Sequence, residues 1–324
     1  MAMIGWSQNV ARQFRDYIKG WLVAVPSLYN YFVANGLKTN VGEGQDRFTY
    51  LATEEPEGGR LVSNIHDYNT IQPQWKEESV GLDHLVARII LSKQDVDRYR
   101  TGNWLRGDLI QDTINITMPK IMNQMDQLLA WGDEYPDSPD ALEVFRSSGE
   151  ITGIFNGGTA YAAGIDEGND MQDAGDYIYT VEGMRDALKT AKHDLDQYML
   201  LSDLRTYRFA AVENQFYTTV GITERQRILE YKWIKNWMNS VNFIDRTGVK
   251  YRMAMIAPQQ KNPAVGGKGP QKNFELFMSY DFAVHPDAGG QTIDNYYVWY
   301  IICGFKLVEY RSTAIQRTGT LTLT

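Results

Sequence analysis

The sequence LVARIILSKQD, residues 85–95, passes from a strand pattern into a helix pattern. Residues Leu85 to Leu91 are apolar except for Arg88, and this short run predicts a buried strand. Ser92 stands where the next helix needs an N-cap, with Asp95 three residues later, near the spacing of a capping box. We therefore expect a strand that leads directly into a short helix over residues 95–100.

A much longer helix pattern follows this short helix. Apolar residues recur every three or four positions from Trp104 to Trp131, which predicts a helix of about 28 residues, roughly 42 Å long. Pro119 should kink this helix, since proline removes a backbone donor, and Gly132 is a good terminator. A helix of this length spans a whole domain.

The segment before the strand divides into an aromatic arm and a hairpin. Helical spacing over residues 1–35 brings Trp6, Phe14 and Trp21 into an apolar pattern that Tyr29 continues. Two interpretations stay open for this arm: it packs on its own domain, or it packs on a neighbouring copy.

The hairpin is predicted from strand patterns over residues 47–52 and 60–63, which flank an acidic, glycine-containing turn. Its apolar side chains are too few for a core of its own, and an isolated hairpin is marginal in water. We therefore expect it to lie on neighbouring subunits. The candidate contact residues of this segment are Phe48, Tyr50, Leu61 and Trp75.

The rest of the chain predicts a mixed domain and then returning strands. Residues 149–158 are rich in glycine, and helix patterns cover Val181 to Leu201 and Thr223 to Met238, with a strand pattern between them over residues 207–212. The last third reads as β structure, with strands over residues 251–256, 274–284, 296–305, 306–310 and 313–323. The fold class expected from this order is α+β.

Composition excludes several classes of protein. The 324 residues are 43% hydrophobic and 22% charged, which excludes a disordered chain. A single cysteine, Cys303, excludes intrachain disulfides and cysteine-based zinc sites. The net charge of −8 argues against a basic nucleic-acid binder. The run 296–305 is too short to cross a bilayer, and the N-terminus does not read as a signal peptide, so no membrane partner is expected.

The sequence shows no motif typical of catalysis. The histidines His66, His84, His193 and His285 lack metal-binding spacing, the glycine loop 265–269 fails the phosphate-loop pattern, and there is no nucleophile elbow. An acidic segment, with carboxylates at Asp166, Glu167, Asp170, Asp173 and Asp176, lacks the spacing of a calcium loop. We expect no enzyme, no cofactor and no metal site.

Three stretches carry a resemblance to a known family. They are the strand and short helix over residues 88–95 with the end of the long helix at 126–133, the glycine-rich 149–158, and the closing segment 304–319. In this order they resemble the major capsid proteins of tailed double-stranded DNA phages and related viruses. That family has the Hong Kong 97-type fold, which encapsulin shells share.

The resemblance implies a division of the chain into the parts of that fold. These are an N-terminal arm (1–42), an extended β-hairpin called the E-loop (43–87), a peripheral domain with a long spine helix (88–148 and 271–311) and an axial domain (149–270 and 312–324). In such proteins the arm and the E-loop contact adjacent copies. The predicted intersubunit residues are therefore the aromatic and apolar side chains already named on these two segments.

The function implied is a major capsid protein that assembles through hexamers and pentamers into an icosahedral shell around double-stranded DNA. The implied partners are further copies of the chain, a portal protein, scaffolding and decoration proteins, and DNA bound without sequence specificity. The implied location is the virion, after assembly in the host cytoplasm. Two alternatives stay open: an encapsulin-type shell around a cargo enzyme, and, more remotely, a soluble metal-dependent enzyme that uses the acidic segment.

Overall fold

A computed structural model gives the structure of the chain. It describes residues 2–24, 27–42, 45, 47–53, 75–102, 108–132, 143–145, 153–160, 169–171, 175–191, 193, 197–211, 221–243, 252–259, 272–286, 296–319 and 321–322.

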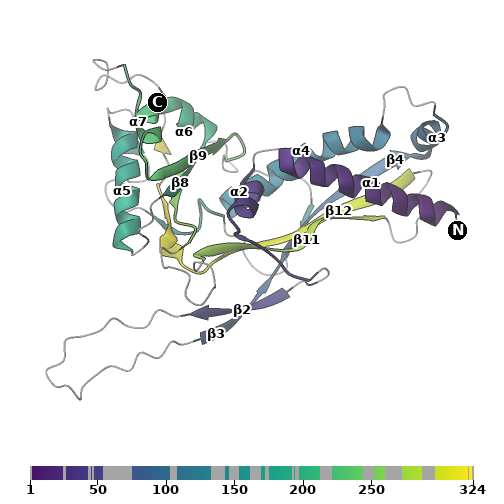
Figure 1. Ribbon diagram of the computed structural model, residues 1–324, viewed down its shortest axis with the longest axis horizontal. Helices are drawn as coiled ribbons and strands as arrows, with labels where there is room; N and C mark the ends of the chain where they lie inside the picture. Colours follow the sequence, from purple (N-terminus) through teal and green to yellow (C-terminus); the bar gives the residue numbers. More distant parts are fainter. Residues whose placement is uncertain are drawn as a thin grey trace.

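Helices and strands alternate through these residues in a mixed α+β order (Figure 1). The helices are α1 (Ala2–Ala24), α2 (Leu28–Ala34), α3 (Lys93–Arg100), α4 (Leu109–Trp131), α5 (Asp176–Thr190), α6 (Leu204–Phe209), α7 (Glu224–Leu229) and the 3₁₀ turn η2 (Ser312–Ala314). The strands are β1 (Lys38–Asn40), β2 (Arg47–Thr53), β3 (Trp75–Gly81), β4 (Asp83–Ser92), β5 (Glu143–Phe145), β6 (Thr159–Ala160), β7 (Asn169–Asp170), β8 (Tyr198–Asp203), β9 (Ile234–Ser240), β10 (Met253–Ile256), β11 (Phe274–Pro286), β12 (Tyr296–Glu309), β13 (Ile315–Arg317) and β14 (Leu321–Thr322).

The first lobe is built on a five-stranded sheet with the strand order β1-β11-β12-β4-β5. The helices α1 and α4 run along one face of this sheet (Figure 1). β4 and β12 pair antiparallel without a register shift from Ser92↔Tyr296 to Asp83↔Phe305. Alternate residues of β4 are buried, so the strand has one face on the core and one face toward solvent.

Capping residues mark the ends of the short and the long helix. Ser92 is the N-cap of α3, and its hydroxyl accepts the amide of Asp95, as expected. The long helix starts later than predicted: its N-cap is Asp108, with an extended backbone, so α4 begins at Leu109 and not at Trp104, and it ends before Gly132 as expected. Pro119 lies inside α4, and the kink expected there stays a prediction. Residues 104–107 lie outside the described residues.

The arm is packed on its own first lobe. Val10, Phe14 and Ile18 on one side of α1 are buried in the same apolar cluster as α4 and the sheet. After α2 the chain forms β1, which adds to the edge of the sheet, parallel to β11, with Lys38 opposite Leu276. Of the two interpretations that the sequence leaves open, the structure shows the packing of α1 on its own domain.

The hairpin is a two-stranded ribbon of β2 and β3, paired antiparallel from Arg47↔Gly81 to Thr53↔Trp75. Residues 75–81, for which the sequence predicts no strand, are therefore the partner strand of 47–53. The predicted partner, 60–63, lies outside the described residues. The ribbon projects away from both lobes (Figure 1).

The second lobe holds another five-stranded sheet, with the order β6-β13-β10-β8-β9, and the helices α5, α6 and α7. β8 and β10 are buried along their whole length. In β8, Tyr198 and Leu200 belong to the cluster under the helices, whereas Met199 and Leu201 belong to the cluster of the first lobe. This sheet is therefore covered on both faces, which explains its continuous apolar strands.

Three predictions of secondary structure in this lobe are wrong. The helix predicted over Val181 to Leu201 ends at Thr190, and Tyr198 to Leu201 form a strand. A short apolar run that is buried on both faces has no period that separates strand from helix. A strand is predicted over 207–212, but residues 204–209 form the helix α6. The helix predicted from Thr223 to Met238 does have Thr223 as its N-cap, but it ends at Leu229 and is followed by β9.

The two lobes meet where α4 ends. The backbone amides of Ile154 and Phe155 donate to the carbonyls of Leu129 and Ala130, at 3.0 and 2.8 Å. These bonds satisfy carbonyls that the end of a helix leaves without partners. The glycine-rich segment 153–158 therefore acts as the cap of the long helix.

Candidate intersubunit surfaces

The predicted contact residues of the first arm helix lie mostly inside the chain. Phe14 is fully buried and meets Trp299 edge to face, with ring centroids 5.6 Å apart. Trp21 is partly buried against the same cluster. Trp6 lies on α1, and its side chain is outside the described part. In this conformation Phe14 reaches another copy only if α1 leaves its own core.

Tyr29, the last predicted residue of the arm, belongs to a polar cluster. Its hydroxyl donates to Asp281 Oδ1 at 2.7 Å and accepts from Lys38 Nζ at 2.9 Å, and Lys38 also pairs with Asp281. Burial, and then the hydrogen bond to Asp281, raise the pKa of Tyr29 above its ordinary value. Asp281 lies in a bulged part of β11, next to Phe282 at φ 54°, a backbone conformation that non-glycine residues seldom adopt.

The base of the ribbon also packs on its own chain. Phe48 is 8% exposed and stacks on Phe277, with ring centroids 4.1 Å apart. Tyr50 lies edge to face against Tyr310 and donates to Glu78 Oε2 at 2.7 Å.

The two remaining predicted residues are farther along the hairpin segment. Trp75 starts β3, but its side chain lies outside the described part, as does the whole of Leu61. Contacts of these predicted residues with another copy stay a prediction.

One face of the first sheet carries exposed apolar side chains. Leu85, Ala87 and Ile89 point into the core under α4, so Arg88 and Ile90 point to the opposite face. Ile90 is 48% exposed, and Tyr296, at the start of the neighbouring strand, is 46% exposed. This face is a second candidate surface for contact with another molecule.

A buried carboxylate on α4 was missed by the sequence reading. Asp126 is only 5% exposed and accepts the backbone amide of Leu28 at 2.9 Å. It thus joins the long helix to the first turn of α2. The signal was present, because Asp126 lies four residues after Met122 and three before Leu129, on the side of the helix that the apolar residues occupy.

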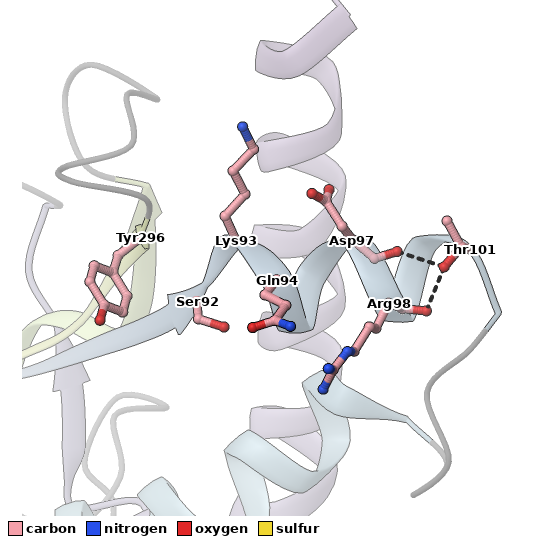
Figure 2. A pocket seen from close by; sticks show the side chains of 7 residues that line it. All are labelled: Ser92, Lys93, Gln94, Asp97, Arg98, Thr101 and Tyr296. Carbon is pink, nitrogen blue, oxygen red and sulfur yellow. Dashed lines mark hydrogen bonds between the residues drawn. The ribbon is translucent and has the colours of Figure 1, made fainter.

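An open pocket lies beside α3, at the end of the first lobe that is far from the second (Figures 1 and 2). It has a volume of about 600 Å³ and is lined by Ser92, Lys93, Gln94, Asp97, Arg98, Thr101 and Tyr296. Figure 2 shows the Thr101 hydroxyl bonded to the carbonyl oxygens of Asp97 and Arg98. Such a hydroxyl caps the end of a helix, so the role of this contact is structural.

The candidates for metal chemistry do not come together in the described residues. Among them, no group of three or more histidine, cysteine or carboxylate side chains is placed to hold a metal ion. Asp166, Glu167 and Asp173 of the acidic segment lie outside the described part, and Asp176 is the first residue of α5. His193 is buried, with Nε2 2.9 Å from Thr313 Oγ1, which is a structural contact.

No helix in the described part of the chain is both long enough and apolar enough to span a bilayer.

Comparison with solved structures gives a consistent group of neighbours. The capsid of Myoviridae phage XM1 aligns over 90% of this chain and 91% of its own, with a TM-score of 0.56 at 13% identity. The chain has the fold of phage capsid proteins. The capsid of a native GTA (gene transfer agent) particle aligns over 89% of both chains, with a TM-score of 0.52 at 11% identity.

A virus-like particle from Pyrococcus furiosus aligns over 95% of this chain and 98% of its own, with a TM-score of 0.50 at 11% identity. No protein-family profile matches the sequence, and no curated protein matches it. The resemblance read from the order of elements is therefore confirmed at the level of the fold, including its mixed α+β class.

Proposed function

We propose that this chain is a major capsid protein that assembles through hexamers and pentamers into an icosahedral shell around double-stranded DNA. The observation that carries the proposal is the shared fold, which extends over about 90% of the chain in phage capsid and gene transfer agent neighbours. A net charge of −8 is compatible with this role, because enclosed DNA is held by the shell and need not be bound tightly.

Two described surfaces are available for contacts with other copies. They are the ribbon β2–β3 and the sheet face on which Ile90 and Tyr296 are 48% and 46% exposed. Burial of these surfaces on other copies would support assembly.

The proposal carries the domain division implied by the resemblance: arm 1–42, E-loop 43–87, peripheral domain 88–148 and 271–311, and axial domain 149–270 and 312–324. The ribbon lies within the second segment, and the second lobe lies within the last. β4 already begins at Asp83, which suggests that the E-loop ends before residue 87. The proposed partners are portal, scaffolding and decoration proteins, and the proposed location is the virion after assembly in the host cytoplasm.

The test is the state of the purified chain at rising concentration. Light scattering and electron microscopy should show closed particles, and particles from infected or producing cells should contain DNA that resists nuclease. A monodisperse monomer under all conditions, with residues 43–87 resistant to protease, would contradict the proposal.

The ribbon can be tested separately by Trp75→Ala, with Thr53→Ala as the matched control. These two residues are opposite each other at the described end of the ribbon. We expect Trp75→Ala to lower the yield of particles while the unfolding transition of the subunit stays unchanged, and Thr53→Ala to assemble normally. Equal assembly of both variants would remove Trp75 from the intersubunit contacts.

An encapsulin-type shell around a cargo enzyme is the second candidate. It is favoured by the alignment with the virus-like particle from Pyrococcus furiosus, which extends over nearly the whole of both chains. Electron microscopy discriminates the two functions: small DNA-free particles with protein inside favour the encapsulin, and DNA-filled particles with a portal vertex favour the virus.

The remote alternative, a soluble metal-dependent enzyme, has a separate test. It requires bound metal in the purified protein that is lost when Asp166 and Asp170 are changed to alanine. Purified protein without such a metal would rule this alternative out.

A further inference from the structure

Asp126 connects two parts of the chain that are far apart in sequence. It lies on α4, close to the end of that helix, and its Oδ1 accepts the amide of Leu28, the first residue of α2. The amide of Tyr29 also donates to this carboxyl. The first amides of a helix have no partner within the helix, so the carboxyl satisfies donors that α2 cannot satisfy itself.

The remaining contacts of this turn fix its position on the body. The Ser27 hydroxyl accepts the amide of Asn30 at 3.1 Å, and Asn30 Nδ2 donates to the carbonyl of Leu22 near the end of α1. α1 and α2 therefore form one connected unit. Besides apolar packing, polar contacts hold this unit to the body, among them Leu28 to Asp126, the Tyr17 hydroxyl to Asp108, and the Tyr29 hydroxyl to Asp281.

Burial opposes the charge of this carboxyl. Burial raises the pKa of Asp126 to about 7, although the amides of Leu28 and Tyr29 lower it. Burial and these two amides are the causes of the shift. Titratable groups of α2 and the strands beside it meet in a cluster of their own: the Tyr29 hydroxyl on α2, Lys38 on β1 and Asp281 on β11. Lys38 and Asp281 have opposite charges and pair with each other.

We propose that Asp126 is a proton-operated latch on the N-terminal arm: the protonated carboxyl holds α1 and α2 on the body, and the ionised carboxylate loosens them. Ionisation places a charge on a carboxyl that is buried among apolar side chains of α2 and α4. Release would free the apolar side of α1, including Phe14, for contact with a second copy. The latch itself does not depend on the proposed shell function.

The sign of the pH dependence follows from linkage. The pKa of Asp126 is about 7 with the arm in place and 3.8 when the carboxyl is in water, so the attached state binds the proton more tightly. The stabilisation is complete below the lower value and is lost as the pH rises through the upper one. Between about pH 5 and about pH 8 the equilibrium constant for release should rise roughly 90-fold.

A matched control is present on the same helix. Asp108, the N-cap of α4, also holds the arm, because it accepts the Tyr17 hydroxyl at 2.7 Å. Burial raises the pKa of Asp108, but hydrogen bonds from Tyr17, Gln111, Ile110 and Tyr99 outweigh it, and the net shift is downward. Protonation of Asp108 should weaken the arm contact, the opposite of Asp126, and only well below neutral pH.

The experiment is hydrogen exchange of the unassembled full-length chain, read by mass spectrometry as protection factors, which correct for the intrinsic effect of pH. In the wild type, protection of residues 9–22 and 27–34 should fall roughly 90-fold between about pH 5 and about pH 8. In Asp126→Asn, which keeps an acceptor oxygen but cannot ionise, it should stay constant within about threefold. In Asp108→Asn the fall should persist. Residues 198–203 of the second lobe are the internal control, because their protection falls only when the whole chain opens.

Two results would overturn the latch. One is constant protection of the arm in the wild type, which needs no variant. The other is a full pH-dependent fall in Asp126→Asn. If that variant does not fold, wild-type chain labelled with ¹³C at the aspartate carboxyls decides the question: the absence of any titration midpoint above about pH 6 overturns the proposal.

Discussion

Phe14→Ala distinguishes an arm that stabilises its own subunit from an arm that serves only its neighbours. Phe14 is fully buried, and its ring meets Trp299 edge to face at 5.6 Å. Removing a buried phenylalanine ring costs about 3–5 kcal/mol, because apolar contacts are lost and a cavity remains. The edge-to-face contact places the expected value within this range and not at its lower end, at about 4 kcal/mol.

The assay is equilibrium unfolding of the unassembled subunit in guanidinium chloride, followed by tryptophan fluorescence, since Trp299 lies against the substituted site. A loss of about 4 kcal/mol should also lower the melting temperature, by roughly 8–16 °C. Gln13→Ala is the matched control, because Gln13 is the preceding residue of α1 and is exposed. It should change the stability by less than about 0.5 kcal/mol.

One combination of stability and assembly would refute the packing of Phe14 in its own subunit. If Phe14→Ala unfolds within about 0.5 kcal/mol of the wild type but fails to form particles, the ring anchors a neighbouring copy and does not belong to the subunit core. A loss of both stability and particles supports the packing described here, because a subunit that cannot hold its arm also presents a changed surface to its partners.

Two further predictions concern the body of the subunit. Lys306 Nζ lies 3.1 Å from Asp83 Oδ2, and Asp83 is fully buried. Asp83→Asn should therefore lower the free energy of unfolding in urea by about 3–5 kcal/mol, whereas the double change Asp83→Leu with Lys306→Met should recover most of the loss. Equal losses for the two variants would contradict a paired buried charge. A Cβ at Gly153 would lie against the amide of Gly132 and 2.6 Å from the carbonyl oxygen of Ala130. Gly153→Ala should therefore destabilise the joint between the lobes by more than about 2 kcal/mol. A calorimetric melt unchanged from wild type would show that the backbone of this joint can shift to make room.

The first lobe could be predicted well because its elements carry local signals. Ser92 and Gly132 mark helix ends, and α1 and α4 keep a helical period over many turns. The strand at 85–91 is also predicted, but only alternate residues of β4 are buried, because the other face of the sheet is open to solvent. The second lobe could not be predicted as well. Its strands are short, apolar on both faces and followed at once by helices, so the sequence around Tyr198 contains no period that decides between the two.

The ribbon shows a different limit of sequence reading. The sequence predicts one strand of a hairpin over 47–52, which the structure confirms as Arg47–Thr53, but the partner of this strand is Trp75–Gly81 and not the nearer strand pattern at 60–63. Pairing across such a distance leaves no short-range signal, because no tight turn sets the register. The contacts of Phe48 with Phe277 are likewise set by tertiary structure and not by spacing.

The arm shows why aromatic content alone does not identify an interface. Phe14 and Tyr29 look equally suited to a neighbouring copy and to the core, because both surroundings reward the burial of a large ring. What separates the two outcomes is the polar chemistry beside them. Asp126, on the apolar side of α4, can be accommodated only if it receives donors, and the first amides of α2 supply them. A lone carboxylate in an apolar pattern therefore predicts a helix end packed against it. Applied to this sequence, that rule predicts a helix N-terminus packed on the long helix beside Asp126, and the start of α2 lies there.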